Sequence, residues 1–142
     1  VQSDAAPLNH MISKALEVGG VVSIKDPTRG GLANLLNEWS EKSKVGILVR
    51  DDKIPVHSGV KAACEMLGLD PLEIGNEGKV ALVVVQEKSE EVLAVLRSTE
   101  LGKEAEIIGR ATDEFNLVAV ETSIRGRRIV VRPVGDPVPR IC

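Results

Sequence analysis

The apolar residues of this chain change their spacing along the sequence, and this change most constrains the fold. Helical spacing, in which apolar residues return every three or four positions, begins near residues 8, 32, 60 and 92. Segments typical of strands occupy residues 21–24, 45–49, 80–85, 105–111, 117–122 and 127–131. Helices therefore alternate with strands early and strands dominate late, which predicts the α+β class.

The predicted architecture is a layered α/β sandwich with a mixed sheet and helices packed against it. Residues 80–85 form a continuous apolar run, which is typical of a strand buried on both faces, so this strand is predicted to be central. A chain of 142 residues with 43% apolar content can build one core of ordinary size. We therefore predict one domain over residues 1–132.

Proline and glycine crowd residues 133–139, where backbone donors are missing and an extended polyproline-like path is favoured. Residues 133–142 are predicted to form a tail that ends at Cys142 and is mobile in this chain. At ~3.1 Å per residue, such a tail reaches on the order of 30 Å. This reach suits a carrier thiol; a frayed end that finishes in cysteine by chance is the alternative.

The sequence Asp-Pro-Thr-Arg-Gly-Gly at residues 26–31 joins a predicted strand to a predicted helix. Backbone N–H groups and the dipole at a helix start favour an anion, and Arg29 is placed to clamp a phosphate oxygen. Gly30 and Gly31 let the backbone approach a ligand, and Asp26 caps the turn or contacts a metal-bound phosphate through water. The alternative is ordinary helix entry, with Asp26 or Thr28 as the cap.

A second polar turn, Gly-Asn-Glu-Gly-Lys at residues 75–79, precedes the apolar run 80–85. Glu77 lies at a strand start between glycines, where a carboxylate can be held toward a cleft to orient or deprotonate an amide. Asn76 beside it is a candidate for facing phosphates. A surface turn with a solvated pair of Glu77 and Lys79 is the alternative.

Composition argues against several classes of function. The net charge of −3, with Trp39 and Phe115 as the only aromatic residues, gives no footprint for nucleic acid. No apolar run reaches the ~18 residues of a membrane span, and no signal peptide opens the chain, so we expect a cytoplasmic protein. Two cysteines and two histidines offer no disulfide framework and no metal site. Cys64 lies on an apolar helix face and is predicted to be a core residue.

Three motifs together resemble the HypE family of hydrogenase-maturation proteins: Asp-Pro-Thr-Arg-Gly-Gly-Leu at 26–32, Asn-Glu-Gly-Lys at 76–79 and Pro-Arg-Ile-Cys at 139–142. The opening Ser-Asp-Ala-Ala-Pro-Leu at residues 3–8 is similar to the linker that enters the second domain of that family. The first motif is shared in looser form with aminoimidazole-ribotide synthetase, selenophosphate synthetase and thiamine-monophosphate kinase. The terminal motif is the most specific.

The resemblance implies a PurM-like C-terminal domain of an ATP-dependent carbamoyl dehydratase. In that family HypF places a carbamoyl group on the terminal sulfur, here Cys142, and dehydration gives a thiocyanate that passes to iron on the HypC–HypD scaffold. ATP and Mg²⁺ are held mostly by an N-terminal domain that pairs across a homodimer. The residues implied to face the phosphates are Asp26, Arg29, Gly30, Gly31 and Asn76, and Glu77 would lie near the carboxamide.

Two other functions stay open at this point. The domain could be a non-catalytic docking module for maturation partners, in which case its turns are structural. It could instead belong to a phosphotransferase of the same superfamily that acts on another small substrate, in which case Cys142 would be incidental.

We predict that this chain folds but is inactive by itself. The chain does not start with methionine, which suggests that it was cut from something longer, and residues 1–142 contain no counterpart of the N-terminal domain. Beyond residues 26–31 the sequence has no acidic cluster and no glycine-rich nucleotide loop. The purified chain should release no ADP from ATP above a buffer control, and measurable turnover would refute the prediction.

Overall fold

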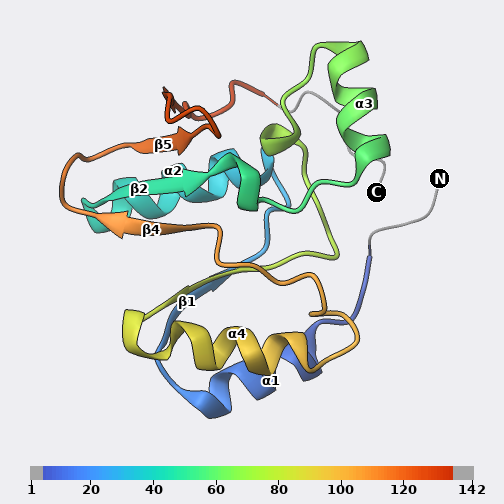
Figure 1. Ribbon diagram of the computed structural model, residues 1–142, viewed down its shortest axis with the longest axis vertical. Helices are drawn as coiled ribbons and strands as arrows, with labels where there is room; N and C mark the ends of the chain where they lie inside the picture. The colour runs from blue at the N-terminus through green and yellow to red at the C-terminus, as the bar shows by residue number, and fades with distance from the viewer. Residues whose placement is uncertain (1–4, 136–142) are drawn as a thin grey trace. The chain divides into compact units, whose positions relative to one another are not determined.

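The computed structural model describes residues 5–135, which divide into two compact units (Figure 1). Among the described residues, the first unit contains 5–27 and 76–107, and the second contains 28–75 and 108–135. Both units combine helices with strands, and the larger sheet is mixed, so the predicted α+β class with a mixed sheet is confirmed. The division into a domain over 1–132 and a tail over 133–142 stays a prediction, and residues 136–142 lie outside the described part.

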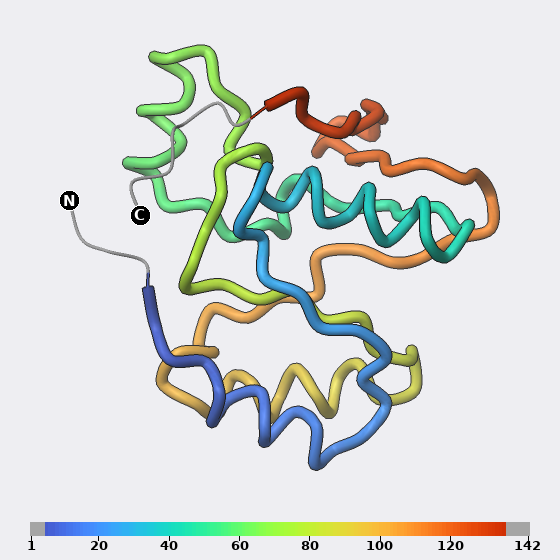
Figure 2. The backbone as a smooth tube through the Cα atoms, turned by 180° about the vertical axis from the view of Figure 1, so that it is seen from behind, coloured from blue at the N-terminus to red at the C-terminus, as the bar shows by residue number. Residues whose placement is uncertain are grey.

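The first unit packs two helices against a two-stranded antiparallel sheet. Its elements are α1 (Asn9–Val18), β1 (Val21–Lys25), β3 (Ala81–Val84), a 3-10 turn η3 (Gln86–Lys88) and α4 (Ser89–Arg97). Helices α1 and α4 lie side by side in both Figure 1 and Figure 2. The core between them contains Met11, Ala15, Val92 and Leu96, as the helical spacing of the sequence predicts.

The prediction that residues 80–85 form a central strand buried on both faces is wrong for the described residues. Strand β3 pairs only with β1, with Lys25 opposite Ala81 and Val21 opposite Val84, and its four residues are half-buried. Leu82 and Val84 pack on the α1–α4 core, whereas β1 carries the exposed apolar residues Val22 and Ile24. A strand whose second face carries partly exposed apolar side chains has the same continuous run of apolar residues as a strand that is covered on both faces, so the sequence cannot distinguish the two.

The second unit contains a four-stranded sheet in the order β4-β2-β5-β6. Its elements are α2 (Gly31–Ser43), β2 (Gly46–Arg50), α3 (Ser58–Leu67), β4 (Gly109–Thr112), β5 (Val118–Glu121) and β6 (Arg127–Ile129), with 3-10 turns η1 (Asp51–Lys53) and η2 (Pro71–Glu73). Strands β2 and β5 are parallel, whereas β4 and β6 pair antiparallel at the two edges. The β5–β6 hairpin turns at Arg125, which has a left-handed φ of 61°.

Helix α2 provides the buried layer over this sheet. Leu35 on the helix and Val49, Val118 and Val120 on β2 and β5 are almost completely excluded from solvent. Complete burial of each such side chain contributes about 1.5–3 kcal/mol. Helix α3, by contrast, buries only Cys64, at 3% exposure, which confirms the prediction for this cysteine.

Charged side chains link the two edge strands through the loop between β4 and β5. The Glu114 carboxylate accepts a hydrogen bond from Arg110 at 3.0 Å and lies 3.7 Å from the Arg127 guanidinium. The hydrogen bond from Arg110 lowers the pKa of Glu114, and both arginine charges act in the same direction. Because these side chains are exposed, the ion pairs of Glu114 contribute little to the free energy of unfolding; they connect the loop to both edge strands.

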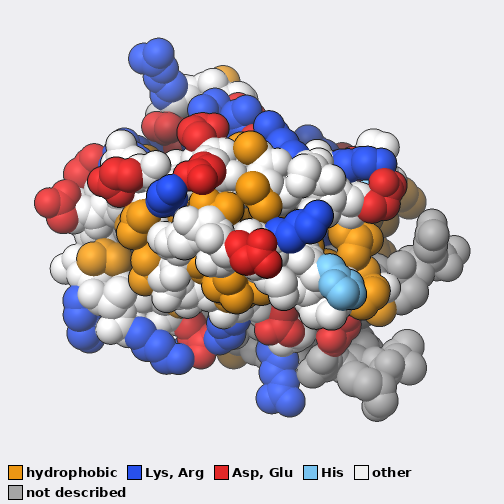
Figure 3. All heavy atoms as spheres, turned by 90° about the horizontal axis from the view of Figure 1, so that it is seen from below, with side chains coloured by type: hydrophobic (Ala, Val, Ile, Leu, Met, Phe, Trp, Pro, Cys, Tyr) orange, Lys and Arg blue, Asp and Glu red, His pale blue; other side chains and the backbone are white. Residues whose placement is uncertain are grey.

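The surface shows no broad field of one charge on the face drawn in Figure 3, where basic and acidic side chains are interspersed with apolar ones. Along residues 5–135, no helix combines the length and the apolar composition that a membrane span requires.

Candidate functional site

The turn over residues 26–31 leads into α2 through two glycines in the left-handed region. Gly30 has a φ of 63° and Gly31 a φ of 60°, and Gly30 is the N-cap residue. Because the cap position is occupied by a glycine, the alternative in which Asp26 or Thr28 is the N-cap residue is wrong. Without a capping side chain, the first backbone N–H groups of α2 suit an external anion.

Gly31 lies where α2 begins against the backbone of residues 72–74. A Cβ at this position would overlap the carbonyl oxygen of Leu72 and would lie 2.6 Å from that of Ile74. Close packing of backbone on backbone therefore already requires glycine here. That the N–H group of Gly31 faces a phosphate stays a prediction.

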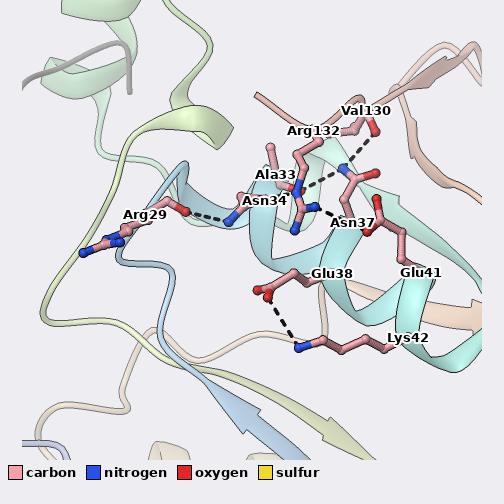
Figure 4. A network of polar contacts seen from close by, with 9 residues as sticks. All are labelled: Arg29, Ala33, Asn34, Asn37, Glu38, Glu41, Lys42, Val130 and Arg132. Carbon is pink, nitrogen blue, oxygen red and sulfur yellow. Dashed lines mark hydrogen bonds and ion pairs between the residues drawn. The ribbon is translucent and has the colours of Figure 1, made fainter. Parts of the chain in front are cut away.

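Arg29 extends from the turn into solvent. Its carbonyl oxygen accepts a hydrogen bond from Asn34 Nδ2 at 3.0 Å, which fixes the backbone of the turn. Figure 4 shows the guanidinium pointing away from this contact. Within residues 5–135 no carboxylate is paired with Arg29, so its charge is available to an anionic ligand.

The remaining candidates that the structure describes, Asp26, Asn76 and Glu77, belong to the first unit, whereas Arg29, Gly30 and Gly31 belong to the second. The backbone N–H of Asn76 donates to the Pro27 carbonyl at 2.9 Å, so the two predicted turns meet within the first unit. Lys79 Nζ donates to Asn76 Oδ1 at 3.1 Å. Asp26 and Glu77 are both exposed. Two motifs that are far apart in the sequence therefore share a backbone hydrogen bond, between Asn76 and Pro27.

Metal binding finds no support in the described part of the chain. Over residues 5–135, no three His, Cys, Asp or Glu side chains lie close enough together to hold a metal ion. Cys142 lies outside the described residues.

Two residues with a structural role at this turn were missed by the sequence analysis. Asn34 contacts both Arg29 and Arg132, and Asn37 donates to the Val130 carbonyl at 3.0 Å. The only signal in the sequence is the spacing of the two asparagines, which places them on one face of α2. Their partner segment lies more than 90 residues away along the chain, so no local pattern could reveal it.

Comparison with known families decides the membership of the chain. The sequence model of the family described as AIR synthase related protein, C-terminal domain, matches residues 2–121. The chain belongs to this family.

The predicted resemblance to HypE is also confirmed: a protein of Methanocaldococcus jannaschii whose name describes hydrogenase expression/formation is 53% identical over the whole chain. A protein of Bradyrhizobium diazoefficiens named carbamoyl dehydratase HypE is 43% identical, also over the whole chain. The chain spans 42% of the length of each.

Two solved structures have the same fold as this family member. A crystal structure of a HypE–HypF complex matches 94% of the chain at 46% identity with a TM-score of 0.90, over 44% of its own chain. A crystal structure of HypE in complex with ATP matches 95% at 38% identity with a TM-score of 0.89, over 43% of its own chain. The PurM-like fold expected from the motifs is therefore established.

Gly31→Ala should lower the free energy of unfolding by about 2–5 kcal/mol, because a Cβ must enter occupied space on a left-handed backbone. Two matched variants separate the cost of the backbone conformation from the cost of the steric overlap. Gly68→Ala has a left-handed φ of 67° in open space, so it reports the backbone cost alone, about 1–2 kcal/mol. Gly59→Ala, helical and also in open space, should gain about 0.5–1 kcal/mol. Denaturant unfolding measures all three, and equal losses at Gly31 and Gly68 would contradict the packing role.

Proposed function

We propose that this chain is the C-terminal part of a carbamoyl dehydratase of [NiFe]-hydrogenase maturation, and that Cys142 carries the carbamoyl group on which the enzyme acts. One observation carries the proposal: similarity to proteins named carbamoyl dehydratase HypE extends over the whole chain, including its terminal Pro-Arg-Ile-Cys motif. The proposed activity is that of the whole protein. The chain spans less than half of the length of the relatives that it matches.

The proposed reaction removes the elements of water from a thiocarboxamide on the Cys142 sulfur. An amide oxygen is a poor leaving group, so ATP transfers its terminal phosphoryl group to that oxygen. Loss of the two N–H protons then breaks the C–O bond, phosphate leaves with the oxygen, and S–C≡N stays on the sulfur. The S–C bond is kept throughout, which is why the cargo can pass later from Cys142 to iron.

Residues of the second unit would bind the phosphates. Arg29 is exposed and without a described carboxylate partner, and the uncapped start of α2 adds backbone N–H groups and the positive end of a dipole. A guanidinium and backbone donors together suit a group that gains negative charge as phosphate leaves. The contact between Arg29 O and Asn34 Nδ2 holds the turn in this form.

Residues of the first unit would act on the amide nitrogen. Glu77 is an exposed carboxylate directly after Asn76, whose backbone N–H is fixed by the Pro27 carbonyl. A carboxylate on an anchored turn can accept a proton from the N–H group of the cargo when the tail delivers it. Asn76 and Asp26 are also proposed to contact the phosphates.

The proposal includes partners and conditions that follow from the family. HypF would donate the carbamoyl group, in line with the solved HypE–HypF complex, and HypC–HypD would accept the nitrile. ATP would bind with Mg²⁺ held outside the described residues, in a homodimer of the whole protein in the cytoplasm. The solved complex of HypE with ATP supports the nucleotide.

Cys142→Ala in the full-length protein should abolish carbamoyl loading and leave the fold intact, because the last residue of a chain ordinarily contributes little to stability. Intact mass after incubation with HypF, carbamoyl phosphate and ATP measures the loading. The matched control is Cys64→Ala, which removes the buried thiol and should keep the mass increase. An undiminished mass increase in Cys142→Ala would end the carrier role.

Arg29→Gln in the full-length protein should slow ATP turnover about 10- to 100-fold, the loss expected when one charge-assisted hydrogen bond is removed. Arg125→Gln is the matched control, because Arg125 is also exposed and lies at the tip of the β5–β6 hairpin. A docking module with a purely structural turn would show the same turnover in both variants. Steady-state ADP release decides between the two functions.

A further inference from the structure

The segment that leads into the tail lies along the polar face of α2. Val130 accepts a hydrogen bond from Asn37 Nδ2 at 3.0 Å, and Arg132 Nε donates to Asn34 Oδ1 at 2.9 Å (Figure 4). Pro133 follows directly, and its Cγ would lie 3.5 Å from a Cβ added to Gly30. The root of the tail, residues 130–133, is therefore held against the same end of α2 that the turn 26–31 enters.

Asn34 uses both ends of its amide in this arrangement. Its Nδ2 donates to the Arg29 carbonyl at 3.0 Å, while its Oδ1 accepts from Arg132 at 2.9 Å. An amide is the side chain that can donate and accept at the same time over this short separation. One side chain therefore joins the proposed phosphate-binding turn to the root of the tail.

The contact with Arg132 lies near the last residues that the structure describes. Val134 is fully exposed at 105% and Gly135 has a left-handed φ of 87°, so the chain leaves the surface of the second unit directly after Pro133. A tethered group samples the space around its last fixed point, and its local concentration at a target falls as the free tether lengthens. Release of Arg132 would move that fixed point back to Val130 and lengthen the free tether.

We propose that Asn34 is a positioning residue: it fixes the root of the tail at Arg132 beside the 26–31 turn, and so sets the region that the Cys142 cargo can reach. The inference rests on the proposed function of Cys142 as a carrier. Arg132 also contacts Glu41 Oε2 at 3.4 Å, but this longer, exposed ion pair does not involve the turn. Of the described contacts of Arg132, the one with Asn34 is therefore the contact that connects the tail root to the turn.

Spin-label distances in the full-length protein test the positioning directly. One label is attached to Cys142 and the other to Lys42→Cys, an exposed position on α2. Asn34→Ala and Arg132→Ala should each broaden the distance distribution, since each removes the same contact from one side. Asn34→Asp keeps an acceptor for Arg132 and should leave the distribution narrow. Asn116→Ala, an exposed asparagine in the loop between β4 and β5, is the matched control and should also leave it unchanged.

Kinetics of the unlabelled, carbamoyl-loaded protein give the functional readout. Arg132→Ala, which removes the contact with Asn34 Oδ1 and keeps the contact with the Arg29 carbonyl, should lower kcat for nitrile formation about three- to tenfold, the range expected from one hydrogen bond of ordinary net strength. KM for ATP should not change in Arg132→Ala, because this variant alters delivery of the cargo and keeps both the Arg29 side chain and the hydrogen bond from Asn34 to the Arg29 carbonyl.

The outcomes distinguish this inference from the proposed function. If Cys142→Ala abolishes nitrile formation while Asn34→Ala and Arg132→Ala leave both kcat and the distance distribution unchanged, the positioning role is refuted and the carrier role stands. A loss of thermal stability in Asn34→Ala without broadening would refute it as well. If Cys142→Ala still forms nitrile, the carrier role itself has failed, and the inference fails with it.

Discussion

The close approach of Gly31 to the backbone of residues 72–74 is the constraint on which the second unit depends. Two carbonyl groups occupy the space that any side chain at this position would need. The approach allows α2 to begin directly after the turn, with Leu35 and Leu36 facing the sheet. A larger residue would displace the helix start and, with it, both the buried layer and the exposed arginine that precedes it.

Helix α2 serves two purposes because its two faces differ in chemistry. Its apolar face packs on β2 and β5 and contributes Ala33, Leu35 and Leu36 to the core of that unit. Its polar face holds the segment around Val130 and Arg132 through Asn37 and Asn34. A rigid helix therefore connects the stability of the core with the placement of the tail.

The chemistry proposed for this protein divides its requirements between the parts of the chain. Phosphate binding needs fixed donors and positive charge, and the start of α2 with Arg29 offers them on an element held by the core. A carrier thiol needs reach, and a tail with several prolines offers it without a large entropic cost of extension. Proton transfer needs an accessible carboxylate on an anchored turn, which describes Glu77.

The sequence by itself determined the helices, the positions of most strands, the buried state of Cys64 and the family. These properties follow from spacing and local motifs, which act over a few residues. The tertiary structure alone decided that β3 pairs only with β1, that Gly31 is required by packing, and that Asn34 bridges Arg29 and Arg132. Each of these depends on groups far apart in the chain, because strand partners and packed backbones meet only after folding, and the local pattern of apolar and polar residues is the same whichever partner is found.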